Sequence, residues 1–513
     1  MKQTIVLLIL EGWGVGEKNR SNPIYIANLP FFKKIEKEFP HTALKASGIA
    51  VGLPWEEKGN SEVGYLCLGT GKIIYQHYPR ISLAIKNKTF FENQVLINAF
   101  NHSKKYSSAV HLVGLLTAGY SCSHMDHLTA LLHLAKQQQV NSVYLHLFTD
   151  GIDSPPKSAK QLLIKLKRIL EQEKLPGEIA SLSGRYYALD QSENWERTER
   201  VYKILIGETK KSDLTPEQLI DNIYSRNLSD QFVPPTLLKQ PVKENDAIIF
   251  FNFREDVSRQ ITFPFALPDY CPIKTKKIDS LKVVTFTEYD KRFNLPVVFP
   301  PQQIKNPLSK ILADHNKIQL KITESQKYDN LAVFFNGYIR KPFANEYRIT
   351  IPSLDVPRPQ EFPQLRANEI TNRVISSIKE RIYDFIVANY ANPDIIGHSG
   401  DFKAGIEVAK IIDQQLSKIY QEVIEKENTI MLITSDHGNM EKMRDPFTGV
   451  PLTDHTTNPV PFYLIGKRFK TETAAGETRI SGIISDVVPT ILELMHIPVP
   501  EDMDGTSLLS TLI

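Results

Sequence analysis

Short apolar runs that stop at polar residues recur along the chain. Thr429–Thr434 consists of apolar and β-branched residues without a helical period, which is typical of a buried parallel strand. Thr4–Leu10, near the N-terminus, is a run of the same kind. Similar runs predict further strands at 110–116, 142–148, 246–252, 281–286, 331–335, 383–388 and 460–465.

Helical periodicity occupies the segments between several of these runs. Ala27–Phe39 carries apolar residues near helical spacing and stops at Pro40, where a helix is expected to end. Ala159–Leu175 has a similar pattern. The clearest case is Ala404–Ile424, whose apolar face consists of Val408, Ile412, Leu416, Ile419 and Val423. Strands that alternate with helices in this way predict an α/β fold.

The domain organisation follows from where the strands with polar ends lie. The first strand and the late strands stop at acids or histidines, and a separate set of βα units lies between them. Phe299-Pro300-Pro301 reads as a stiff linker. We therefore predict one discontinuous domain, residues 1–78 and 300–513, with residues 79–299 inserted as a second domain. The two joins between them would form a hinge.

Composition narrows the class of protein. Of the 513 residues, 42% are hydrophobic and 23% are charged, as in a globular protein. The net charge of +3 comes without a basic, aromatic-rich stripe, so no nucleic-acid partner is expected. No apolar stretch approaches the roughly 20 residues of a membrane span. We therefore expect no membrane partner. The cysteines are too few for a disulfide framework, so we expect a cytoplasmic protein. They are Cys67, Cys122 and Cys271.

Acids and histidines gather near the ends of three late strands. Ligands of open α/β sheets bind beyond the carboxyl ends of strands, and carboxylate with imidazole suits zinc or manganese. Any one of these residues alone is more often structural, but so many converging polar groups would be costly to bury without a cation. The candidate metal ligands are Asp394, His398, Asp436, His437 and His455.

Two earlier residues join this set. Glu11 ends the first strand and is followed by glycine. Ser61 lies in the segment Gly59-Asn60-Ser61-Glu62-Val63-Gly64, where Asn and Ser favour the start of a helix. A hydroxyl beside the free N–H groups of a helix would stabilise a phosphate on its oxygen. By itself, a serine at such a position is more often only a helix cap.

Several segments together identify a family. GNSEVG, GRYYALD, FFNFRED, ANPDIIGHSGD, TSDHGNME and DHTTNPVPF resemble the cofactor-independent (2,3-bisphosphoglycerate-independent) phosphoglycerate mutases of the alkaline phosphatase superfamily. The resemblance runs from Leu7 to about Leu509, with the motifs in family order. It implies an alkaline-phosphatase-like, doubly wound sheet domain with a second α/β phosphotransferase domain inserted. It also implies two divalent metal ions, commonly Mn²⁺, and no need for 2,3-bisphosphoglycerate. We expect a monomer that acts on a small phosphorylated metabolite.

The resemblance also implies a role for individual residues. One metal site would consist of Asp394, His398 and His455. The other would consist of Asp436, His437 and Ser61, with Glu11 where the family has Asp. Ser61 would be the nucleophile that carries the phosphoryl group between the 3- and 2-positions of phosphoglycerate. Substrate contacts would come from Asp153, Arg185, Arg254 and Lys327, and from the positions of Cys122 and His124.

The substrate pocket departs from the family pattern. Cys122 stands where the family has His, and Ile152, Gln191 and Val257 stand where it has Arg. Arginines bind carboxylate and phosphate groups in bidentate fashion, and neither Ile nor Val does so. His124 and His127 would partly replace the missing histidine.

Three hypotheses are therefore open. The first is a phosphoglycerate mutase with a weakened pocket, in which Arg340, Lys341 or Arg348 supplies the missing charge. The second is a phosphatase or phosphomutase of the same superfamily that acts on a less anionic substrate. The third is a non-catalytic paralogue that binds a phosphometabolite or a partner, and the intact set of ligands speaks against it.

Overall fold

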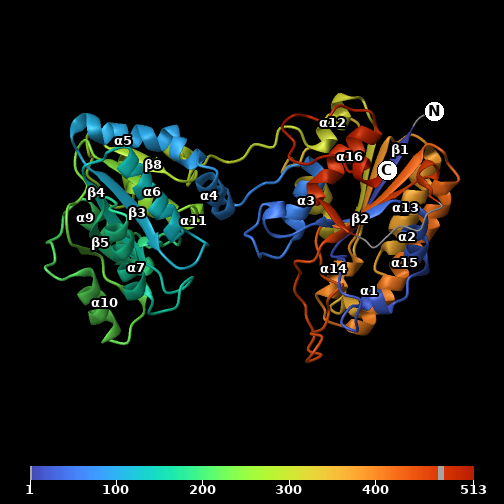
Figure 1. The fold of residues 1–513 in the computed structure, drawn as a ribbon, viewed down its shortest axis with the longest axis horizontal. Helices are drawn as coiled ribbons and strands as arrows, with labels where there is room; N and C mark the ends of the chain where they lie inside the picture. Colours follow the sequence, from blue (N-terminus) through green and yellow to red (C-terminus); the bar gives the residue numbers. More distant parts are fainter. Residues whose placement is uncertain (1–2, 472–478) are drawn as a thin grey trace. The chain divides into compact units, whose positions relative to one another are not determined.

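The computed structural model describes residues 3–471 and 479–513. It divides the chain into two compact units (Figure 1). The first unit consists of Met1–Gln76 and Gln303–Ile513, and the second of His77–Gln302. The predicted joins at 78/79 and 299/300 fall close to these divisions. Each unit is built around its own sheet, with helices on both faces.

The sheet of the first unit is mainly parallel. Its strand order is β10 (Glu346–Ile351), β9 (Gln319–Glu324), β11 (Phe385–Tyr390), β1 (Thr4–Leu10), β12 (Thr429–Thr434), β13 (Val460–Ile465), β2 (His41–Lys45) and β14 (Ile480–Ile483). Leu7 of β1 lies opposite Val387 of β11 and Leu432 of β12, and both pairings are parallel. β13 is antiparallel to β12 and β2. The carboxyl ends of β11, β1 and β12 therefore meet at one edge of the sheet.

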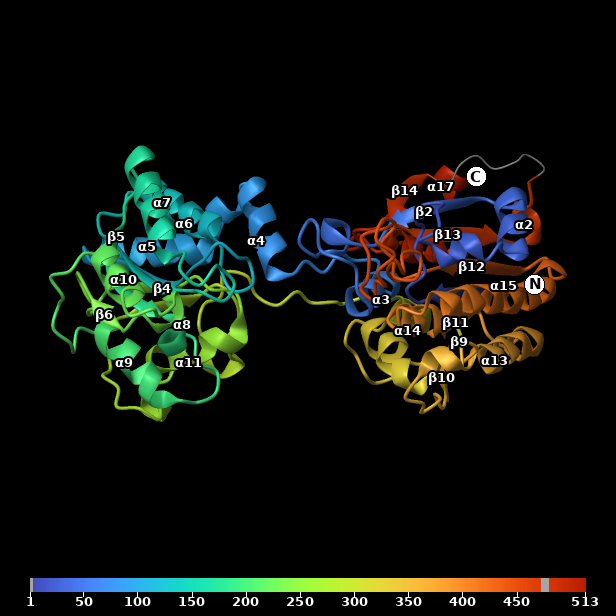
Figure 2. The ribbon, with the colours of Figure 1, turned by 90° about the horizontal axis from the view of Figure 1, so that it is seen from below.

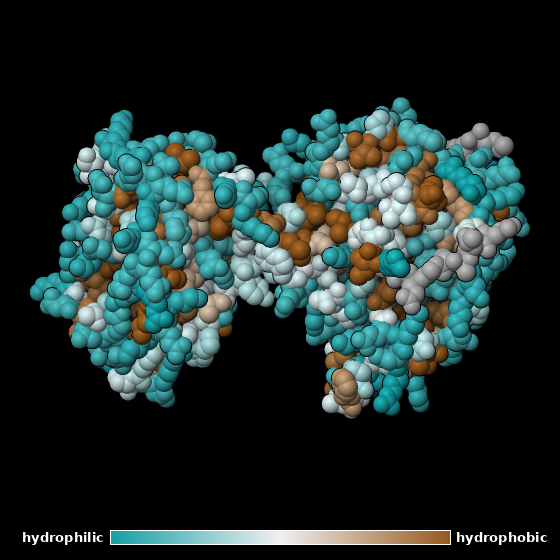
Figure 3. Space-filling view, in the orientation of Figure 1, coloured by the Kyte–Doolittle hydropathy of each residue, from teal (hydrophilic) through white to brown (hydrophobic). Residues whose placement is uncertain are grey.

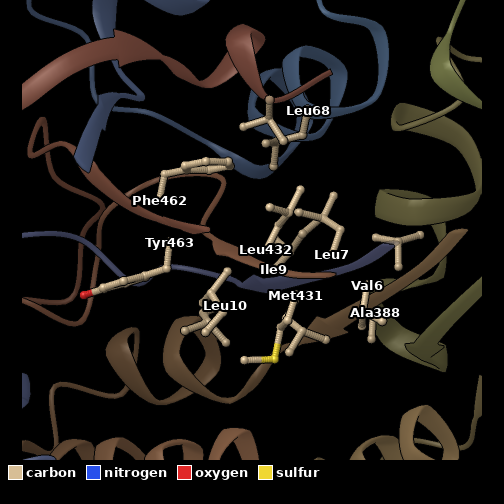
Figure 4. Packing of buried hydrophobic residues seen from close by; sticks show 14 of the residues in the cluster. Val6, Leu7, Ile9, Leu10, Leu68, Ala388, Met431, Leu432, Phe462 and Tyr463 are labelled. Carbon is tan, nitrogen blue, oxygen red and sulfur yellow. The ribbon is translucent and has the colours of Figure 1, made fainter. Parts of the chain in front are cut away.

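Helices cover both faces of this sheet (Figure 1). One face carries α1 (Pro23–Ile26), α2 (Pro30–Glu38), α13 (Ala367–Glu380) and α15 (Phe402–Ile424), and the other carries α3 (Ser61–Thr70), α12 (Leu308–Asp314) and α16 (Val487–Leu494). Two short helices complete the unit, α14 (Asn392–Gly397) and α17 (Leu509–Leu512). Figure 4 shows Leu7 and Ile9 of β1 pointing toward Leu68 of α3, and Leu10 and Met431 pointing to the opposite face. This alternation gives the central strands two buried faces, so they read as continuous apolar runs.

The second unit has a parallel sheet with one antiparallel edge strand. The strand order is β6 (Thr236–Leu237), β5 (Glu178–Gly184), β4 (Val143–Thr149), β3 (Val110–Leu116), β7 (Ala247–Phe250) and β8 (Lys282–Thr285). One hydrophobic core involves α4 (His77–Lys86), α5 (Gln94–Tyr106), α6 (Met125–Gln137), α7 (Ala159–Gln172) and α10 (Pro216–Tyr224). A second core, on the other face, involves α8 (Arg185–Ala188), α9 (Trp195–Leu205) and α11 (Glu255–Ala266). Figure 2 shows these two groups of helices on opposite sides of the sheet.

One predicted strand is wrong. The apolar run 331–335 lies in a π-helical turn over Asn330–Phe334 and packs on α3. Its backbone comes so near α3 that a Cβ added at Gly69 would lie 2.1 Å from the carbonyl oxygen of Phe335. The strand of this region is β9, where Lys321 interrupts the apolar pattern. Lys321 is nevertheless buried, because its ammonium group donates to the carbonyl oxygen of Leu331 and approaches Glu346 at 3.4 Å.

The surface shown in Figure 3 is mostly hydrophilic on each unit, with apolar residues scattered between polar ones. None of the helices in the described part of the chain combines the length and the apolar character that crossing a membrane requires.

Candidate active site

The predicted metal ligands lie at the carboxyl edge of the first unit's sheet. Glu11 follows β1, and Asp436 and His437 follow β12 after one intervening residue. Asp394 lies in α14, the short helix after β11, and His398 follows that helix directly. His455 comes from the loop before β13. Parallel pairing of the strands thus brings residues from distant parts of the chain to one place.

Ser61 is the first residue of α3, and Asn60 is its N-cap. The side chain of Asn60 accepts a hydrogen bond from the backbone N–H of Val63, so the interpretation of Ser61 as the cap itself is not needed. The glycines of this motif allow close contact with the strand ends. A Cβ added at Gly64 would lie 2.5 Å from the carbonyl oxygen of Asp436, and one at Gly59 would lie 2.8 Å from the Cβ of His437. The segment therefore requires glycine at both places to hold Ser61 against the ligand set.

Asp394 is the centre of one group of ligands. Its Oδ1 lies 3.3 Å from Nε2 of His398 and 3.4 Å from Nε2 of His455. The two imidazole Nε2 atoms are 3.0 Å apart. Nδ1 of His455 lies 2.8 Å from the carbonyl oxygen of Gly59, and Nδ1 of His398 lies 2.7 Å from that of Thr453. These backbone contacts orient each ring with Nε2 toward Asp394, as in many metal sites.

Glu11 is the centre of the second group. Oγ of Ser61 lies 3.0 Å from Oε1 of Glu11 and 3.1 Å from Nε2 of His437. Sequence reasoning missed three further residues that donate to the Glu11 carboxylate; they are Tyr65, Asn330 and Asn389. The position of Asn389 near the end of β11 was the only signal for them. These donors hold a carboxylate that is one methylene longer than the Asp of the resembling family.

The donor set fits divalent cations. The ligand atoms of Asp394, His437 and His455 lie within 4.8 Å of one another, and so do those of Glu11, Asp436 and His437. Within the part of the chain that the structure describes, the buried Oδ2 of Asp436 has no hydrogen-bond partner, although a bare carboxylate oxygen is costly to bury. Burial, together with the charges of Glu11 and Asp394, raises the pKa of Asp436 well above its usual range. A cation beside Asp436 would bind the unpartnered oxygen and would favour the charged form of the carboxylate.

Lys327 bridges the two groups. Its Nζ lies 2.5 Å from Oε1 of Glu11 and 2.9 Å from Oδ2 of Asp394. Burial opposes its charge, but the two carboxylates raise the pKa of Lys327 above its ordinary value. The ammonium group is therefore charged and faces the candidate ligands.

The predicted substrate residues Asp153 and Arg185 lie together in the second unit. A guanidinium nitrogen of Arg185 donates to Oδ1 of Asp150 at 2.6 Å and to Oδ2 of Asp153 at 3.2 Å. Ser121 donates to the same oxygen of Asp153. Sequence reasoning missed Asp150, although its place directly after β4 was a signal. Its carboxylate orients Arg185.

Cys122 and Arg254 lie beside this pair. Burial raises the pKa of the Cys122 thiol, and the nearby guanidinium groups of Arg185 and Arg254 oppose that shift. Arg254 forms a bidentate pair with Asp256, with nitrogen–oxygen distances of 2.8 and 2.9 Å. His124 has a different place, as the N-cap of α6. We expected His124 to replace the histidine that the family has at position 122. The hydrogen bond that the His124 side chain accepts at the start of α6 does not favour this role.

The other departures from the family pattern differ in exposure. Ile152 is 61% exposed, and Gln191 is also exposed. Val257 is only 4% exposed and packs in the same apolar core as Cys122. Two of these positions thus face solvent and two are part of the core.

The cations that were expected to compensate belong to the first unit. Arg348 donates to Glu346 at 2.7 Å and to the Tyr328 hydroxyl at 3.1 Å. Arg340 pairs with Asp329 at 3.0 Å on the surface, and Lys341 is exposed.

Comparison with known proteins gives a consistent result. Residues 3–499 match the family model described as the metalloenzyme superfamily. The chain is 42% identical over 511 residues to the 2,3-bisphosphoglycerate-independent phosphoglycerate mutase of Antithamnion sp., which covers 99% of this chain and 98% of that protein. It is 40% identical over 515 residues to the protein of the same name from Clostridium tetani, with 99% of both covered. A crystal structure of Leishmania mexicana phosphoglycerate mutase at low cobalt concentration is similar at 25% identity and a TM-score of 0.51, over 99% of this chain and 97% of the other.

Proposed function

The chain belongs to the family of 2,3-bisphosphoglycerate-independent phosphoglycerate mutases, and we propose that it interconverts 3-phosphoglycerate and 2-phosphoglycerate through a phosphoserine at Ser61. The setting of Ser61 carries this proposal. Its hydroxyl lies between Glu11 and His437 at the first turn of α3. A helix N-terminus favours negative charge through its dipole and its free N–H groups, so a phosphoryl group on this oxygen would be stabilised.

Two divalent metal ions fit the donor set described above. Asp394, His398 and His455 would hold one, and Glu11, Ser61, Asp436 and His437 would hold the other. Mn²⁺ is the proposed metal, because imidazole ligands disfavour Mg²⁺. When bound, the ions neutralise charge on the phosphoryl oxygens and lower the pKa of the Ser61 hydroxyl.

The proposed reaction has two transfers that mirror each other. Oγ of Ser61 attacks phosphorus, the bond between phosphorus and O3 of 3-phosphoglycerate breaks, and O3 takes the proton that the Ser61 hydroxyl gives up. O2 of the glycerate then attacks the phosphoserine, and the proton of that hydroxyl returns to Ser61. Glu11 accepts the hydrogen bond of the Ser61 hydroxyl and orients it. Lys327, which faces the same ligands, would contact the phosphoryl oxygens.

Recognition of the glycerate is assigned to the second unit. Arg185, oriented by Asp150 and Asp153, would bind an anionic group of the substrate, since a guanidinium group binds carboxylate or phosphate in bidentate fashion. Arg254 would do the same beside Cys122. The first unit would thus supply the metal-binding, phosphatase-like chemistry and the second the substrate contacts. We also propose a monomer, and a reducing cytoplasm as its setting, since three scattered cysteines are too few for a disulfide framework.

A second function is favoured by one observation. Cys122 and Val257 lie in an apolar core, at positions where the family resemblance implies histidine and arginine. A pocket with fewer cations binds a substrate that carries both a carboxylate and a phosphate less tightly. A phosphatase or phosphomutase that acts on a less anionic phosphate ester is therefore the alternative.

Product analysis separates the two functions. The protein would be loaded with Mn²⁺, incubated with 3-phosphoglycerate and followed by phosphorus NMR. Formation of 2-phosphoglycerate is the expected result. Release of inorganic phosphate would favour the alternative, and an unchanged substrate with intact Mn²⁺ binding would leave only a binding role. The Ser61→Ala variant is the control, since it should give neither product.

A further inference from the structure

A buried carboxylate outside the ligand set ties together the segments that carry the ligands. Glu441 is 1% exposed. Its Oε2 accepts the backbone N–H of Gly14 at 3.0 Å and that of Asn439 at 2.8 Å. Its Oε1 accepts the Asn458 amide at 2.9 Å and the Thr456 hydroxyl. A carboxylate is the one side chain that accepts from all four donors at once.

Each donor lies within a few residues of a predicted ligand. Gly14 follows Glu11 in the loop after β1, and Asn439 follows Asp436 and His437 in the loop after β12. Thr456 directly follows His455. Glu441 therefore connects three separate loops, one of which lies 427 positions away in sequence.

The fourth ligand-bearing segment is reached through one further residue. The backbone of Asn439 is held by Glu441, and its side-chain amide donates to Oδ1 of Asp394 at 3.0 Å. A Cβ added at Gly397 would lie 2.5 Å from Oδ1 of Asn439, so this contact is close on both sides. The position of Asp394 thus also depends on Glu441.

The surrounding glycines show how closely the loops fit this carboxylate. A Cβ added at Gly14 would lie 2.2 Å from Cδ of Glu441, and one at Gly438 would lie 2.6 Å from its Oε1. Backbone hydrogen bonds join the same loops, from Met440 to Gly12 and from Thr456 to Gly438, both at 2.9 Å. The glycines make room for the carboxylate, which in turn satisfies N–H groups that would otherwise be buried without a partner.

We propose that Glu441 is a positioning residue of the metal centre: its carboxylate sets the spacing of the ligand-bearing loops and thereby the affinity for the metal ions. This inference rests on the proposed function, because it assumes that the cluster binds divalent metal. Residues that orient metal ligands from outside the site commonly change metal affinity by about 10- to 100-fold when they are replaced.

Glu441→Gln is the test, because glutamine keeps the shape and loses one acceptor. Its NH₂ group must face either the N–H groups of Gly14 and Asn439, which then lose their acceptor, or Thr456 and Asn458. In the second case the Thr456 hydroxyl can turn to accept, but the Asn458 amide loses its acceptor, so at least one contact is lost in either orientation. Mn²⁺ binding, measured by calorimetry on the full chain, should weaken by about tenfold or more. KM for 3-phosphoglycerate at saturating Mn²⁺ should change little, since the substrate contacts are elsewhere.

Asp413→Asn is the matched control. Asp413 is likewise a buried carboxylate of the first unit, and it accepts the backbone N–H groups of Phe31 and Phe32 at 3.2 and 3.0 Å, where α2 begins. Asp413→Asn should lower the stability of the protein about as much as Glu441→Gln does, as judged by thermal unfolding. It should leave the Mn²⁺ affinity within about twofold of the wild-type value.

Gly14→Ala perturbs the same contact without removing the charge. Its methyl group would displace Glu441 and should also weaken Mn²⁺ binding. Gly466→Ala is its control, because among the described residues the atom nearest to a Cβ at that position is Cδ2 of Phe469, at 3.3 Å. Unchanged Mn²⁺ affinity in Glu441→Gln and Gly14→Ala, with a wild-type protein that binds Mn²⁺, would overturn the positioning role alone. A wild-type protein that binds no Mn²⁺ would overturn the proposed metal centre and the positioning role with it.

Discussion

The candidate catalytic residues of the first unit interlock, whereas the candidate recognition residues of the second unit are sparse. Ser61 contacts both Glu11 and His437, and Lys327 bridges two carboxylates. In the second unit, Arg185 is held by both Asp150 and Asp153. Arg254, however, pairs with Asp256, two positions along the chain, and Ile152 is 61% exposed. Residues that each serve several partners leave little freedom for substitution, while a recognition surface made of separate contacts tolerates the loss of some of them. Under the proposed function, the chain would combine a complete centre for phosphoryl transfer with a reduced set of substrate contacts.

The largest effect should come from removing the nucleophile. Ser61→Ala should lower kcat by about 10⁴-fold or more, as expected for loss of a covalent catalyst. Mass spectrometry of wild-type protein quenched during turnover should place a phosphoryl group on Ser61. Substantial turnover by the variant would exclude the phosphoserine and, with it, the contrast drawn between the two units.

Metal removal should be nearly as severe. Excess chelator should abolish activity, because no cations would then neutralise the charge on the phosphoryl oxygens or favour loss of the proton from the Ser61 hydroxyl. Mn²⁺ should restore activity better than Mg²⁺ does, since His398, His437 and His455 offer imidazole nitrogens. Full activity in chelator would mean that the clustered ligands are structural.

Much of this architecture follows from local pattern. Thr4–Leu10, Thr429–Thr434 and Val460–Ile465 are uninterrupted apolar runs, and each forms a strand at its predicted bounds. The likeness to Leishmania mexicana phosphoglycerate mutase confirms the predicted α/β fold class. β9 escaped prediction because Lys321 is made compatible with burial by partners elsewhere in the chain. The strand predicted at 331–335 was wrong because this segment instead forms a helical turn that packs against Gly69 of α3.

The candidate site likewise has residues that the sequence predicts and residues that it does not. Ligand types at strand ends are visible in the sequence, and parallel pairing brings them together. The residues that hold the ligands are not visible, because their partners are remote: Asn389 donates to Glu11 across 378 positions of sequence, and Gly14 donates to Glu441 across 427. Asn and Glu at such places look like ordinary polar residues until the fold is known.

Acid should weaken the second unit through His127. Burial, followed by the charge of His124, lowers the pKa of His127 to about 3, below its ordinary value of 6.5. Between these values the unfolded chain binds a proton that the folded one does not, so stability falls as the pH falls. At pH 5 the loss is about 2 kcal/mol. Hydrogen exchange of β3 and β4 should therefore accelerate from pH 7 to 5, after correction for intrinsic rates.

His127→Gln should reduce this pH dependence, since glutamine accepts the Ser82 hydroxyl without titrating. His102→Gln, at a partly exposed position of the same unit, is the control and should keep the wild-type profile. An unchanged profile in His127→Gln would show that other groups control the acid response.

The smallest expected effect tests whether the recognition surface is reduced. Ile152→Arg places a guanidinium group at a 61% exposed position next to Asp153, where it needs no rearrangement of the core. If the pocket lacks cations, kcat/KM for 3-phosphoglycerate should rise about tenfold, equivalent to about 1.4 kcal/mol of added binding to an anionic group. Ile152→Gln, similar in exposure and uncharged, should give no such gain. Val257→Arg should instead destabilise the second unit, because Val257 is 4% exposed and lies in an apolar core.

The opposite outcome would be a wild-type protein that already turns over phosphoglycerate at about 10 s⁻¹ or faster, together with an Ile152→Arg variant of the same kcat/KM. Other cations would then already bind the substrate. The second unit would then be as complete as the first.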